Sequence, residues 1–123
     1  MLLTLETPEH QYYLRGANGE VALVNERELG RSFVIAPNQL LEDWAATDVR
    51  LLTPADLAPL IAMQPEVILI GSGATQAFPP AAALAAGLSL GIGVEVMTNA
   101  AAARTFNVLA GESRRVVAGF IFP

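Results

Sequence analysis

Six residues in the second half of this sequence have the types and spacing that could bind a small ligand. A glycine turn between an apolar strand and a helix offers backbone amides to an anion. An arginine adds a forked donor, and a desolvated carboxylate can move a proton. The six residues are Gly71, Ser72, Gly73, Glu95, Arg104 and Asn107. They predict a site for a small anion that involves no metal and no cofactor.

The glycine turn alone is weak support for such a site. Gln76 stands where a dinucleotide-binding motif has glycine or alanine, and the lysine and hydroxyl of a phosphate-binding loop are absent. Pro79 and Pro80 remove two amides from the start of the next helix. A tight turn without a ligand is therefore the favoured interpretation, and anion binding is the alternative.

Arg104 and Asn107 are three residues apart on a predicted helix over 99–110, so they lie on the same edge of it. Most other positions of this helix are apolar, and we expect it to be buried on most faces. A buried arginine needs a partner, for which Glu95 is the natural candidate. We favour a structural role in which Arg104 and Asn107 tie the helix to neighbouring loops. The alternative is that Arg104 binds an anion and Asn107 orients it.

Catalytic groups are scarce along the chain. The sequence has no cysteine, and His10 is its only histidine. Thiol chemistry is therefore excluded, and serine-nucleophile schemes lack a base near the glycine turn. Glu95 has no visible co-catalyst as a general acid or base. The sequence favours a protein that is not an enzyme.

Composition indicates one globular domain over residues 1–123. The 123 residues are 53% hydrophobic, and the formal net charge is −5 with no lysine. An acidic chain repels phosphate backbones, so we expect no nucleic-acid partner. The apolar stretch 78–94 is rich in alanine and glycine and is a poor membrane span. The start of the chain lacks the features of a signal peptide, so we expect a cytoplasmic protein.

The pattern of apolar residues predicts an α/β fold. Continuous apolar strands alternate with helices after residue 65, which favours a parallel βαβαβ part in a mixed sheet, with an N-terminal hairpin layer and helices packed on the sheet. Trp44 is expected to anchor an irregular segment, and the closing residues 120–122 to leave an apolar edge that favours a homodimer. The predicted strands are 12–15, 20–24, 32–36, 66–70, 92–97 and 116–122, and the predicted helices are 54–63, 80–86 and 99–110.

Three segments together resemble a known family. They are Val67–Gly73, Gly91–Met97 and Ala103–Leu109, the last of which contains the string Arg-Thr-Phe-Asn-Val-Leu. They resemble the domain-of-unknown-function family that includes mitochondrial complex I assembly factor 3, and the similarity spans most of the chain. It implies one α/β domain with a mixed sheet, helices on one side and a hairpin layer on the other.

The same resemblance implies a function. The mitochondrial relatives help to assemble respiratory complex I through protein contacts, so the implied partners are complex I subunits or assembly proteins. The family supplies no established catalytic residues to transfer. Ala103 stands where relatives often have a cysteine, so a thiol-dependent role at this position is excluded. We therefore expect a bacterial, assembly-factor-like interaction domain, with the small-anion site as the alternative.

Overall fold

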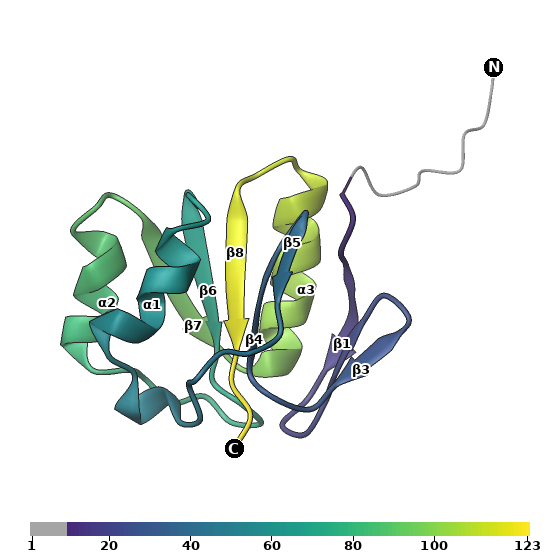
Figure 1. Ribbon diagram of the computed structural model, residues 1–123, viewed down its shortest axis with the longest axis horizontal. Coiled ribbons are helices and arrows are strands. Elements are labelled where there is room, and N and C mark those ends of the chain that lie inside the picture. Colours follow the sequence, from purple (N-terminus) through teal and green to yellow (C-terminus); the bar gives the residue numbers. More distant parts are fainter. Residues whose placement is uncertain (1–9) are drawn as a thin grey trace.

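Two β-sheets organise the computed structural model of the chain, which describes residues 10–123 (Figure 1). The predicted α/β class and hairpin layer are confirmed. The strands are β1 (Leu14–Ala17), β2 (Ala22–Val24), β3 (Arg27–Leu29), β4 (Phe33–Ala36), β5 (Gln39–Leu41), β6 (Val67–Gly71), β7 (Gly93–Met97) and β8 (Val116–Phe120). The helices are α1 (Pro54–Ile61), α2 (Ala81–Leu88), α3 (Asn99–Gly111) and one 3₁₀ turn, η1 (Val49–Leu51).

The larger sheet has the strand order β5-β4-β8-β6-β7. Strand β6 pairs in parallel with both β7 and β8, as the alternation of strands and helices predicts. Strand β4 joins the other edge of β8 in antiparallel orientation, with Phe33 opposite Phe120. The sheet is therefore mixed. The smaller sheet, in the order β1-β2-β3, is antiparallel throughout.

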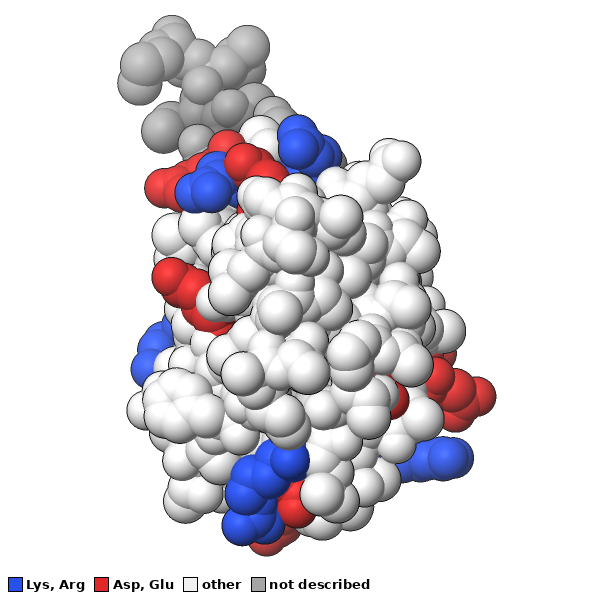
Figure 2. All heavy atoms as spheres, turned by 90° about the vertical axis from the view of Figure 1, so that its left-hand side faces the viewer, with Lys and Arg blue, Asp and Glu red and all other residues white. Residues whose placement is uncertain are grey.

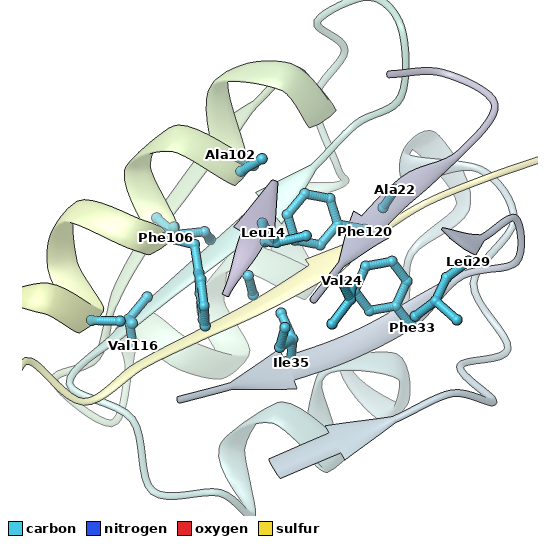
Figure 3. Close-up of a cluster of buried hydrophobic side chains, with 14 of the residues drawn as sticks. Leu14, Ala22, Val24, Leu29, Phe33, Ile35, Ala102, Phe106, Val116 and Phe120 are labelled. Atoms are coloured by element: carbon cyan, nitrogen blue, oxygen red, sulfur yellow. The ribbon is translucent and has the colours of Figure 1, made fainter. Parts of the chain in front are cut away.

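Each face of the larger sheet is covered by a separate apolar layer. Ile68 and Ile70 belong to the cluster that includes Leu57 and Leu60 of α1. Leu69, between them, belongs to the cluster with Phe106 of α3 (Figure 3). This alternation explains the continuous apolar sequence of β6, because a strand buried on both faces needs apolar residues at every position.

The position of α3 corrects one implied feature. The resemblance placed the helices on one side of the sheet and the hairpin layer on the other. In the structure, α3 shares its side with the smaller sheet and packs against β1, while α1 and α2 lie across the larger sheet (Figure 1). The side chain of Leu14 from β1 joins the same apolar cluster as Ala102 and Phe106 of α3 (Figure 3).

The predicted apolar edge at residues 120–122 is wrong. Strand β8 lies in the middle of the larger sheet, and Phe120, Ile121 and Phe122 are all buried. Phe33 of β4 stacks on Phe120 with ring centroids 5.1 Å apart. The two edges are formed by β5 and β7 instead. A homodimer therefore cannot use β8 as a free edge.

Trp44 anchors its segment against the core, as predicted. It is buried, and its indole nitrogen donates a hydrogen bond to the Asp56 carbonyl in the first turn of α1 (2.8 Å). Thr53 and Asp56 form a reciprocal cap at the start of this helix. The indole ring lies against Gly119 of β8, where a Cβ atom would come within 2.5 Å of the ring carbon Cζ3.

The contact between Trp44 and Gly119 gives a prediction for stability. The substitution Gly119→Ala should destabilise the fold by about 1–3 kcal/mol, because the added methyl group overpacks the site. Urea unfolding monitored by circular dichroism measures this. Gly111→Ala is the matched control, since nothing lies within 4 Å of its Cβ position. Equal stability of the two variants would contradict the close packing described here.

Candidate functional site

The loops after the three parallel strands meet at one end of the larger sheet, where open α/β sheets bind ligands. Gly71 is the last residue of β6, and its carbonyl accepts a hydrogen bond from the Ile121 amide after β8 (3.1 Å). The next amide, that of Ser72, donates to the carbonyl of Met97 at the end of β7 (2.8 Å). Backbone hydrogen bonds therefore fix the glycine turn to both neighbouring strands.

Asn99 joins this loop cluster from within. Its side chain is fully buried at the start of α3. The Oδ1 atom accepts a hydrogen bond from the Gly73 amide (3.1 Å), while Nδ2 donates to the carbonyls of Asn18 (3.0 Å) and Ile121 (3.2 Å). A Cβ atom at Gly71 would collide with Oδ1, so glycine is required there by close approach.

Sequence reasoning missed Asn99. A polar residue directly after the helix cap Thr98, in a junction that follows a parallel strand, was the available signal. Its hydrogen-bond partners come from distant parts of the chain, so spacing alone does not identify them.

The amides of the glycine turn have protein partners. Gly73 has φ of +107°, a conformation that favours glycine. The Ser72 hydroxyl donates to the Thr75 carbonyl (2.8 Å) and accepts a hydrogen bond from the Ala77 amide (3.3 Å). These bonds account for the turn without a ligand. The use of Gly71, Ser72 and Gly73 as a ligand site stays a prediction.

The other three predicted site residues lie apart from this turn. Asn107 forms a pair of hydrogen bonds with the backbone of Leu14, accepting from its amide (2.9 Å) and donating to its carbonyl. It ties α3 to β1, which matches the structural interpretation. Glu95 lies exposed on the edge strand β7.

The expected burial of Arg104 is wrong. Its side chain is exposed, and among residues 10–123 it forms no ion pair with Glu95 or another acid. The alanine-rich sequence of α3 suggested burial on most faces, but alanine is also compatible with exposure. Since Arg104 lies in solvent, it needs no internal partner.

An uncharged surface covers the side of the molecule formed by α1 and α2. We define the α1–α2 face as the exposed residues of 57–63 and 78–92, two segments without a charged residue. In Figure 2, which looks onto this side, charged side chains lie around the periphery and the centre holds none. Phe78 (64% exposed), Leu88 (54%) and Leu90 (62%) are large apolar side chains within it.

The chemistry available for metals is limited in the part that the structure describes. Residues 10–123 contain no group of three histidine, aspartate or glutamate side chains that could hold a metal ion. Nor is any helix within this range long and apolar enough to cross a membrane.

The three hydrogen bonds of Asn99 predict a large loss of stability on truncation. Asn99→Ala should lower the free energy of unfolding by about 3 kcal/mol, because it leaves buried backbone groups unpaired. Thr98→Ala is the control in the adjacent residue and should cost about 1 kcal/mol, since it removes only the helix cap. Thermal and urea unfolding compare the two. Similar losses for both variants would contradict the central position of Asn99.

Comparison with known proteins places this fold in a family. Residues 15–121 match the family model described as "Protein of unknown function (DUF498/DUF598)". The chain is 30% identical over 95 residues to a Francisella tularensis protein named "13 kDa major membrane protein", covering 76% of this chain and 77% of that one.

Solved structures agree with this family match. An NMR structure from Xanthomonas campestris is 49% identical, with a TM-score of 0.83, covering 98% of this chain and 92% of its own. An NMR structure from Bordetella pertussis, described as an Mth938-like domain, is 25% identical with a TM-score of 0.79 and the same coverage, 98% and 92%. The chain therefore belongs to the DUF498/DUF598 family and has the fold of its Mth938-like members.

Proposed function

We propose that this protein is a non-enzymatic interaction domain that binds another protein through its α1–α2 face. The carrying observation is the exposure of Phe78, Leu88 and Leu90 within a surface that has no charged residue. An exposed apolar patch on a folded chain marks an interaction site, and we infer that these three side chains belong to one. The chain as a whole is acidic, but its acidic residues lie mainly in the first half of the sequence and outside the two segments of this face.

The chemistry of the face defines the partner. A charged group buried against it would lose its hydration without gaining an opposite charge. The contacting patch of the partner is therefore apolar and uncharged, with its own polar groups at the rim. Such a surface is typical of a subunit that is later covered by further subunits of a complex.

Respiratory complex I is the partner that we propose. The support is the sequence resemblance to the family of mitochondrial complex I assembly factor 3, in which the mitochondrial relatives act through protein contacts. The name of the Francisella relative, a major membrane protein, is compatible with a protein that works at a membrane. In this proposal, the domain covers an apolar surface of a complex I subunit before assembly is complete.

Complementation of a deletion strain tests this proposal. In the native host, deletion should lower the amount of assembled complex I in membranes, measured by native gel electrophoresis and NADH:quinone activity. The wild-type gene should restore it. The double substitution Leu88→Glu and Leu90→Glu should not, because it places two charges in the contact.

Val108→Glu is the matched control for this experiment. Val108 is also apolar and 59% exposed, but it lies on α3, across the sheet from α1 and α2. This variant should restore assembly fully. Unaltered complex I in the deletion strain would overturn the complex I role, and full restoration by the double variant would overturn the contact face. Circular dichroism must first show that both variants are folded.

A further inference from the structure

A cavity of about 330 Å³ lies at the opposite end of the larger sheet from the glycine turn. It is bordered by the end of β4, the turn before β5, Met63 after α1, Ala110 of α3 and the first residues of β8. None of the six predicted site residues lines it. Small-molecule sites in proteins begin at about this size.

The cavity arises from a mismatch in strand length. The last paired residues of β4 and β8 are Ile35 and Ala118, whereas β8 begins two residues earlier, at Val116. Pro37 ends β4, because it has no amide to continue the ladder. Val116 is paired with Val67 of β6 on its other side. The first two residues of β8 therefore have a strand on one side and the cavity on the other.

Basic residues line this cavity in an acidic protein. His10, Arg114 and Arg115 line it, and no acidic residue does. Arg114 is paired with the nearby Glu66 (Nε to Oε1, 3.3 Å). The same carboxylate accepts a hydrogen bond from the Arg115 amide (2.9 Å), and this bond, with the two guanidinium groups nearby, lowers the pKa of Glu66 below its ordinary value.

Arg115 has guanidinium N–H groups that are not all used in the described structure. Its Nε atom donates to the Gln64 carbonyl (3.3 Å), and among residues 10–123 its guanidinium forms no ion pair. The contact with Gln64 ties the residue before β8 to the segment between α1 and β6. This contact uses one of the N–H groups of the guanidinium. Within residues 10–123, the two terminal nitrogen atoms of the fork form no hydrogen bond.

The rest of the lining is largely apolar. Pro37 and Met63 are partly exposed along it, and the buried core residues Ala36, Val116 and Val117 also border it. A ligand with a charged end and a short apolar body would match both parts. A carboxylate presents two oxygens at the spacing of a guanidinium fork.

We propose that this cavity binds a small organic monocarboxylate, with its carboxylate on the terminal nitrogens of Arg115 and its apolar chain against Pro37 and Met63. No reaction is implied, since the ligand is held and not changed. Phe78, Leu88 and Leu90, the large exposed apolar side chains of the α1–α2 face, do not line this cavity.

Titration with hexanoate, followed by ¹H–¹⁵N NMR spectra of the full chain, tests this proposal. Hexanoate should shift the amide signals of Met63, Arg115 and Val116 in a saturable way. Hexylammonium has the same apolar chain with the opposite charge and should not. Arg115→Gln should weaken hexanoate binding by about tenfold or more, because the charged fork is lost.

Arg31→Gln is the control variant, because Arg31 is a highly exposed arginine outside this cavity. It should leave the affinity for hexanoate unchanged. Equal shifts with hexanoate and hexylammonium, no saturable shift at these amides, or equal affinity of the Arg115→Gln variant would each overturn the proposal. The comparison of the two ligands needs only the wild-type protein, so it remains decisive even if Arg115→Gln fails to fold.

Discussion

The central position of β8 is the constraint on which the rest of this structure depends. This strand pairs with β4 on one edge and β6 on the other, and every residue from Val116 to Phe120 is buried. Its Gly119 allows the Trp44 ring to approach on one face, while Phe120 and Val116 pack with α3 on the other. The final residues of the chain then reach Asn99, which holds the loops at the carboxyl ends of the parallel strands. The core, the loop cluster and the cavity at the start of β8 all follow from this placement.

The ion pairs of the described structure and the uncharged α1–α2 face occupy different parts of the surface. The five ion pairs within residues 10–123 all lie outside the α1–α2 face, and their side chains are largely exposed. Exposed pairs of this type contribute little to stability. The stability of the fold instead comes from the two apolar clusters on either side of the larger sheet. The exposed side chains of the α1–α2 face lie outside this core.

Local signals in the sequence predicted local structure well. Thr53, Pro54 and Asp56 specify the start of α1, because helix capping depends on residues within one turn. Strands β6, β7 and β8 follow from continuous apolar runs, which are also local features of the sequence. Strands β3 and β5 were not predicted, since each has only three residues and takes its order from antiparallel pairing with a neighbour.

Features that depend on distant contacts were not predictable in this way. The antiparallel pairing of β4 with β8 decides that residues 120–122 are buried, and nothing near them in the sequence indicates it. Asn99 is separated from Asn18 by 81 residues. The exposure of Arg104 depends on which side of α3 faces the sheet, and an alanine-rich helix leaves that side ambiguous. The absence of charge between Val67 and Val94 was visible in the sequence, but only the packing of α1 beside α2 makes it a surface.

Site-specific photo-crosslinking in the native host can detect the proposed contact between the α1–α2 face and a protein partner. A photoreactive amino acid is placed at Leu88 in one strain and at Val108 in another, and the crosslinked products are identified by mass spectrometry. We expect a product with a complex I subunit or assembly protein from position 88 and none from position 108. Crosslinking from Val108 alone, or only to a second copy of this chain from Leu88, would contradict it.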